Sequence, residues 1–308
     1  MPQNTATGDT ASPSPKKSAT GRIVLAAVIV LLIAVSFWSF GSGRDEGLHE
    51  RRLASERLLM DAESLADPSK QAEAYQTLIA AHGSSDDVRI SRTVALAMLG
   101  RASLLDSLAE QVRLVDAAIS RLDKPGGTGE DEANLCHALA MRAELESRPA
   151  EKTAILDRVI ARFGDAADPD IQGQVARAMW EKAELVRDSS ERDRLLDEVV
   201  RRYADSSSTN VRWEVAKAMN LKGDTRTESA ARNAAYDEVI ARFAADRNAF
   251  IQGQVVWALS RKAEIAATAP EKLVLYDRII NEYANSRDEF IRGSVERALA
   301  AREELSRE

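Results

Sequence analysis

The sequence predicts an all-α fold: a solenoid of antiparallel helix pairs, preceded by a single N-terminal transmembrane helix. Three observations lead to this prediction. Aromatic residues make up only 5% of the 308 residues, and Ala, Leu, Arg and Glu are abundant, which is typical of helical proteins. The pattern of the segment 170–203 returns every 40 residues. One uncharged stretch, 23–40, is long enough to cross a bilayer.

The 40-residue period is visible in two columns of residues. In the first column an aspartate opens a D-x-[VI]-[VI]-x-x-[FY] run, and in the second a branched apolar residue recurs. The members are Asp157, Asp197, Asp237 and Asp277, and Ile171, Val211, Ile251 and Ile291. A fixed period of roughly 20–50 residues is typical of stacked repeats, in which each unit packs against its neighbours.

Three segments are predicted before the repeats. Residues 1–22 are rich in Ser, Thr, Pro and Ala without an apolar period, which predicts a disordered tail. From Ile23 to Phe40 the 18 residues carry no charge, and as a helix of about 27 Å they nearly match a bilayer core of about 30 Å. The run exceeds the usual apolar length of a cleaved signal peptide and ends in aromatics, so a signal-anchor is preferred. Residues 41–47 then form a glycine-rich linker.

The location expected for this chain is a membrane, crossed once. Basic residues are nearly balanced on the two sides of 23–40, so their distribution does not fix the orientation. A short tail followed by a large domain is the signal-anchor arrangement, which places the repeats outside the cytoplasm. In a bacterium this compartment would be the periplasm.

The repeat domain is predicted to occupy residues 48–308. Its first helix runs from Leu48 to before Pro68, and its second covers 71–82. Ser, Asp and Pro between the periodic segments mark helix starts and breaks. The later helices are expected at 86–105 and 107–122, 129–147 and 150–163, 168–187 and 189–203, 208–224 and 228–243, 248–267 and 269–283, and singly at 288–306.

Two columns of small residues in the first helices predict close helix packing. The first column is alanine in six copies: Ala97, Ala138, Ala178, Ala218, Ala258 and Ala298. The second contains Ala102, Ala143, Ala183, Gly223 and Ala263, and becomes Glu303 in the last copy. A solenoid needs a polar outer face on its terminal repeat, so we expect the last helix to serve as a cap.

Short helix pairs, small residues in the first helix and aromatic residues in the second resemble the tetratricopeptide repeat family over about residues 45–306. The period is longer than the family's usual period of about 34 residues, and its Trp-x-x-Leu-Gly signature is reduced to Leu221, Lys222 and Gly223. HEAT or Sel1-like arrays are alternatives. The resemblance implies a right-handed superhelix whose first helices line a concave surface that binds peptides or protein segments.

If Ala183 matches the small residue of the family's first helix, the resemblance also implies a protein-binding face. Tryptophan and arginine are enriched at binding hot spots, whereas a tryptophan buried between helices is the commoner case. Trp213 replaces a glycine found in neighbouring copies, so it either fills a gap or protrudes. The residues implied for the face are Arg177, Trp180, Glu184, Lys217, Asn220, Asp224, Trp257, Ser260 and Glu264.

Acidic residues recur on this face with the period of the repeats. They could attract a basic partner segment, but the interpretation we prefer is an ordinary solvated helix face. The column consists of Glu144, Glu184, Asp224, Glu264 and Glu304.

Charge and motif content argue against several other classes of protein. The net charge is −7, and because residues 1–44 carry +3, the remainder carries −10, which disfavours nucleic acid as a partner. The three histidines lie far apart, and no metal, cofactor or phosphate motif is found.

The aspartate column suggests a role in helix packing or loop bonding. The single cysteine, Cys136, falls in an alanine slot, which predicts a buried, inert thiol.

The sequence therefore predicts a non-enzymatic, membrane-anchored scaffold that binds other proteins or peptides through the concave face. Two alternatives remain open at this point. One is a self-associating structural component of the cell envelope, which would be a homo-oligomer. The other is an enzyme or solute-binding domain within a helical array, against which the missing catalytic residues count.

Overall fold

The computed structural model describes residues 46–124 and 128–307, and in these two ranges helices and short turns are present without any strand. The predicted tail 1–22, the predicted transmembrane segment 23–40 and residues 41–45 of the linker lie outside the described residues. Among the helices that are described, none is both long and apolar enough to cross a membrane. The prediction of an all-helical chain is confirmed for this part.

A helix over residues 46–63 comes first and crosses the boundary between two compact units, Met1–Arg57 and Leu58–Glu308. The second unit contains helices α2 to α13. Its further helices match the predicted segments to within a few residues. They are α2 (Pro68–His82), α3 (Val88–Ala102), α4 (Leu108–Leu122), α5 (Gly129–Glu144), α6 (Pro149–Phe163), α7 (Pro169–Leu185), α8 (Ser189–Tyr203), α9 (Thr209–Thr225), α10 (Ser229–Phe243), α11 (Ala249–Ile265), α12 (Ala269–Tyr283) and α13 (Glu289–Leu305).

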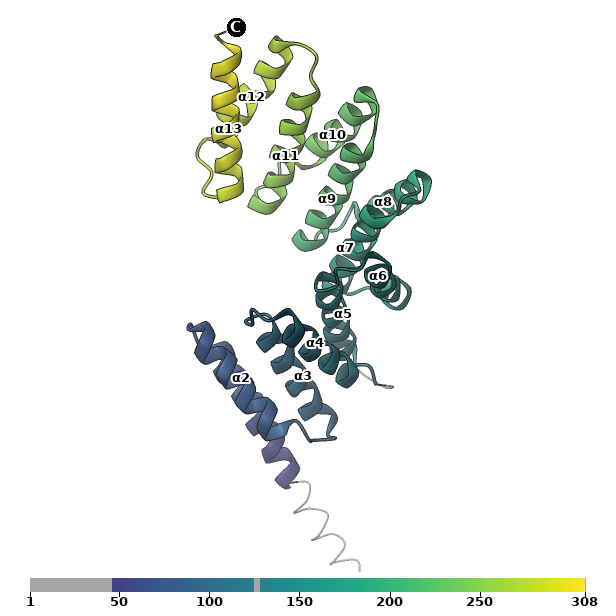
Figure 1. Cartoon of the computed structure of the whole chain (residues 1–308), viewed down its shortest axis with the longest axis vertical. Coiled ribbons are helices and arrows are strands. Elements are labelled where there is room, and N and C mark those ends of the chain that lie inside the picture. Colours follow the sequence, from purple (N-terminus) through teal and green to yellow (C-terminus); the bar gives the residue numbers. More distant parts are fainter. Residues whose placement is uncertain (1–45, 125–127, 308) are drawn as a thin grey trace, which may run out of the picture. The chain divides into compact units, whose positions relative to one another are not determined.

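The helices of this unit pack in two layers. Each helix from α2 to α13 contacts the next one along the chain, as Figure 1 shows for α11, α12 and α13. The odd-numbered helices α3 to α13 also contact each other directly, with Cα atoms within 8 Å, whereas the described even-numbered helices do not. The odd-numbered helices thus form the more closely spaced layer, which we call the odd layer.

Small side chains allow this close approach. All six residues of the alanine column lie on odd-layer helices and are buried. The branched residues three positions earlier, such as Val175 and Val215, are fully buried as well. The core therefore lies between the two layers and between successive odd helices, as the sequence columns predict.

The aspartate column joins successive repeats. Asp157 on α6 accepts a hydrogen bond from Lys182 Nζ on α7 at 2.6 Å, across 25 residues of sequence. The same pair recurs as Asp197–Lys222, Asp237–Lys262 and Asp277–Arg302. The side chains of these aspartates are 44–59% exposed, so each pair contributes little energy by itself, on the order of 1 kcal/mol or less. Their recurrence confirms the predicted packing role.

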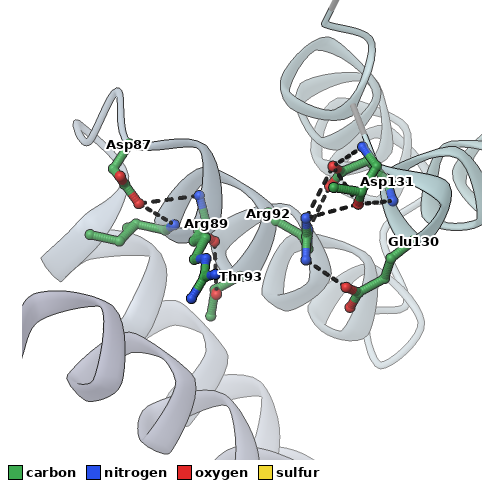
Figure 2. A network of polar contacts seen from close by, with 8 residues as sticks. Asp87, Arg89, Arg92, Thr93, Glu130 and Asp131 are labelled. Atoms are coloured by element: carbon green, nitrogen blue, oxygen red, sulfur yellow. Dashed lines mark hydrogen bonds and ion pairs between the residues drawn. The ribbon is translucent and has the colours of Figure 1, made fainter. Parts of the chain in front are cut away.

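A further network holds α3 against the start of α5 (Figure 2). Arg92 Nε and Nη2 donate to the two carboxylate oxygens of Asp131 at 2.5 and 3.0 Å, and Nη1 pairs with Glu130 at 2.6 Å. Asp131 also accepts from the backbone N–H of Thr128 at 2.8 Å, within a capping box. Asp131 is buried, so this network places a charge inside the repeat interface.

The last helix has a polar outer face, as expected for a cap. Glu296 and Glu303 of α13 are exposed, while the residues at the same positions of α11, Val256 and Ala263, are buried. Leu299 is exposed for the same reason, since no described helix follows α13.

These positions give a test of the repeat register. Ala178 is buried on α7, which contacts both α5 and α9, so Ala178→Leu should overpack the interface and cost about 1–3 kcal/mol. Glu303→Ala on the exposed cap should change stability by no more than about 0.5 kcal/mol. Denaturant melts of both variants would measure the difference, and equal destabilisation would contradict this register.

Candidate functional site

The odd layer carries a groove of about 480 Å³ that crosses three successive helices. Helices α5, α7 and α9 each contribute side chains to it. Its lining residues are Ala133, Asn134, His137, Asp170, Ile171, Gly173, Gln174, Arg177, Asn210, Trp213 and Glu214. We call this feature the α5–α9 groove.

One amide side chain from each of the three helices lines the groove. These are Asn134 on α5, Gln174 on α7 and Asn210 on α9. None of the three amide groups hydrogen-bonds to another residue in the described ranges, and Gln174 Oε1 is buried without a partner. Each amide offers both a donor and an acceptor, so the groove presents polar groups that a bound molecule can satisfy.

Trp213 forms an aromatic wall of the same groove. Its ring lies 5.6 Å from that of Phe250 on α11, measured between centroids, and the ammonium of Lys217 lies 3.8 Å from its centroid. Its indole N–H has no hydrogen-bond partner among the residues that the structure describes. The sequence left open whether Trp213, at a position where neighbouring copies have glycine, fills a gap or protrudes. In the structure Trp213 lines the groove.

A polar cluster ties Trp180 on α7 to α9. The Trp180 indole N–H donates to Glu214 Oε2 at 2.7 Å, and Lys217 lies 3.6 Å from the same oxygen and 4.8 Å from the Trp180 ring centroid. Glu214 is only 6% exposed. Burial raises the pKa of Glu214, while Lys217 and Trp180 act in the opposite direction. The cluster therefore fixes the positions of both tryptophan rings beside the groove.

The charged groups at the groove are mostly engaged. Arg177 Nη1 forms an ion pair with Glu144 at 2.5 Å, and Arg177 Nε donates to the buried Glu181 at 2.7 Å. Desolvation lowers the pKa of His137 and outweighs the attraction of Glu144, with Arg177 adding to the decrease. This shift disfavours the charged imidazolium form of His137, and the uncharged ring can both donate and accept a hydrogen bond.

A second cluster surrounds Asp224 at the end of α9. Its carboxylate accepts from Trp257 Nε1 at 3.2 Å, from Arg261 Nε at 2.8 Å and from the Tyr236 hydroxyl at 2.6 Å. Trp257 is 38% exposed and stacks on Phe290 of α13, with 6.4 Å between ring centroids. A separate aromatic surface is therefore exposed on α11 and α13.

The predicted site residues are divided between these places. Arg177, Trp180 and Lys217 lie together beside the groove, and Asp224 meets Trp257 in the second cluster. Asn220 is buried, and its Nδ2 donates to Gln254 of α11, so it joins two helices. Ser260 is half-buried, and Glu184 and Glu264 are exposed.

The recurring acids are not a uniform exposed row. Glu144 pairs with Arg177, Glu264 pairs with Arg261 at 2.5 Å, and Asp224 accepts three hydrogen bonds. Desolvation and the nearby Glu181 carboxylate raise the pKa of Glu184. Several of these carboxylates therefore contribute to internal contacts instead of standing open to a partner.

The sequence patterns did not single out Glu214 or the three groove amides. A signal exists for all of these except Asn210, because Asn134, Gln174, Glu214 and Gln254 form a column of hydrogen-bonding side chains spaced by 40 residues. Cys136 is buried, and burial raises the pKa of its thiol to about 12, as expected for an inert thiol. In residues 46–124 and 128–307, no group of side chains is arranged to hold a metal ion.

Comparison with known proteins gives no further assignment. No protein-family model matches this sequence, and no curated protein matches it. The geometry of the odd layer is therefore the basis for a functional proposal.

Proposed function

We propose that this chain is a membrane-anchored helical-repeat scaffold that binds other proteins or peptides along the odd layer. The observation that carries the proposal is the α5–α9 groove, which combines unpaired amides, a tryptophan wall and a histidine from three successive repeats. Grooves with a few convergent polar groups and aromatic side chains are typical of binding sites.

The packing supports a tetratricopeptide-like form of this scaffold. The odd helices contact each other directly and the even helices do not, so a stack of such pairs bends toward the odd layer. The odd layer then becomes the concave face of a right-handed superhelix. This places Trp180, Trp213 and Trp257 on the face that would bind a partner.

The anchor is proposed from the sequence of residues 23–40, whose 18 uncharged residues end in aromatics. We propose that it crosses the membrane once and leaves the repeats outside the cytoplasm. Self-association by end-to-end stacking is disfavoured, because Glu296 and Glu303 place charges where a following helix would pack.

Trp257→Ala is expected to weaken partner binding by about 2 kcal/mol or more with little loss of stability, because this side chain is exposed on the odd layer. Trp180→Ala should weaken binding and also lower stability by about 1–3 kcal/mol, because buried Glu214 loses its indole donor. Crosslinking and pull-down from intact membranes, combined with thermal melts, would measure both effects.

The matched control is Val274→Ala, which truncates an exposed apolar side chain on the even helix α12. It should leave both the melting temperature and the recovered partners unchanged. Full partner recovery by correctly folded Trp180→Ala and Trp257→Ala proteins would contradict binding along the odd layer.

A further inference from the structure

We propose that the α5–α9 groove binds a proline-rich segment of a partner protein in the polyproline II conformation. This inference rests on the proposed function and names the class of partner for the same groove. Three features of the groove support it: its unpaired amides, the spacing of its helices and its tryptophan wall.

The unpaired amides favour a ligand with an open main chain. Asn134, Gln174 and Asn210 each present a donor and an acceptor that no other described residue satisfies. An α-helical ligand uses its own main-chain groups internally, whereas a polyproline II segment has no internal hydrogen bonds. Its carbonyl oxygens are therefore available to the amide N–H groups, and the N–H groups of its non-proline residues to the amide oxygens.

The spacing of the helices favours a three-residue repeat. Packed helices lie roughly 8–10 Å apart, and α5, α7 and α9 are in direct contact in that order. A polyproline II chain repeats every three residues, or about 9 Å, whereas a β-strand repeats every two residues, or about 7 Å. A polyproline II segment crossing the helices thus presents the same side of its main chain to each successive helix.

The tryptophan wall supplies a surface for a proline ring. Trp213 has an unpartnered indole N–H within the described structure, and the neighbouring Phe250 is 62% exposed. Aromatic-lined grooves with such a donor are a common way to bind proline-rich segments. Lys217 holds the Trp213 ring in place before a ligand arrives, which reduces the entropy lost on binding.

Gly173 adds no side chain to the groove lining on α7. A Cβ added there would meet only Asn210 and Val211 of α9, both at about van der Waals distance, 3.9 and 4.0 Å. The groove therefore combines a glycine, an aromatic wall and amides from three odd-layer helices.

The test uses the full-length chain in detergent micelles and fluorescently labelled peptides of roughly twelve residues, or four polyproline II turns. One set has proline at every third position with varied residues between, and the other has the same compositions with the prolines moved out of this period. Fluorescence anisotropy should give a Kd at least about tenfold lower for the best periodic peptides than for their rearranged partners.

Trp213→Ala and Gln174→Ala should each raise that Kd by about tenfold, whereas Val274→Ala, on the even helix α12 and outside the groove lining, should leave it unchanged. Circular dichroism checks that the variants are folded, and Gln174→Ala preserves the test if Trp213→Ala unfolds. Equal binding of both peptide sets, no binding of either set, or a Kd unaffected by the two groove variants would overturn the proposal.

The pull-down experiment separates this proposal from the more general one. If partner capture depends on Trp257 and Trp180 while periodic peptides do not bind, the polyproline assignment fails and the scaffold function stands. If neither partner capture nor peptide binding depends on the odd layer, both proposals fail.

Discussion

Arg92→Ala is expected to destabilise the repeat domain by about 3 kcal/mol, because it leaves the buried carboxylate of Asp131 without its cation. The side chain of Asp131 is only 7% exposed, and Arg92 supplies two of its hydrogen bonds (Figure 2). Urea unfolding followed by circular dichroism would measure the change. Arg89→Ala, at an exposed position of the same helix, is the control and should cost no more than about 0.5 kcal/mol.

The same pair makes stability depend on pH in a defined direction. Burial opposes ionisation of Asp131, but Arg92 and Thr128 outweigh it, so the pKa of Asp131 lies below its usual value. The contribution of this pair to the free energy of unfolding is complete above the carboxyl pKa of the unfolded chain, about 3.9. It is lost as the pH falls through the lower pKa that Asp131 has in the folded protein. Arg92→Ala should remove the part of the pH dependence of stability that comes from this pair.

A double variant, Arg92→Ala with Asp131→Ala, should recover part of the stability that Arg92→Ala loses. No recovery would contradict a specific interaction between the two side chains.

Gly223→Ala should destabilise the protein by about 2–3 kcal/mol, although alanine is normally the better helix former. A Cβ at this position would lie 2.4 Å from Cε1 of Tyr236. That ring is fully buried, and its hydroxyl donates to Asp224 at 2.6 Å, so it cannot move aside without breaking this contact. Thermal and denaturant melts would measure the loss.

Gly173→Ala is the matched control, because Gly173 is also a buried glycine within an odd-layer helix. Its added Cβ would meet no atom closer than 3.9 Å. This variant should therefore be neutral or gain up to about 1 kcal/mol from helix propensity. Equal effects of the two alanines would show that Tyr236 does not constrain Gly223.

Most of the helical architecture follows from the sequence, because its determinants are local and repeated. The alanine column from Ala97 to Ala298 identified the helices that pack against each other, and Glu303 identified the polar end. Prolines and cap residues such as Pro149 and Asp188 placed the helix starts within a few residues. Such signals recur in every copy, so a single chain carries them several times.

The site depended far more on tertiary structure. Trp180 and Trp257 belong to different clusters, and Asn220, which shares their predicted face, is buried against Gln254. No sequence pattern shows that Trp180 bonds Glu214 or that Asp224 bonds Tyr236, since these partners are set by which helices lie side by side.

The sequence by itself thus determined the period, the helices, the packed alanines and the capped end, because these depend on spacing along one chain. Only the tertiary structure decided which polar side chains remain unpaired. Asn134 and Gln174 share a repeat column that does not include Asn210, and the three amides line one groove because α5, α7 and α9 pack in succession. Hydrogen bonding is satisfied or left open by atoms distant in sequence, so the groove becomes visible only when the helices are assembled.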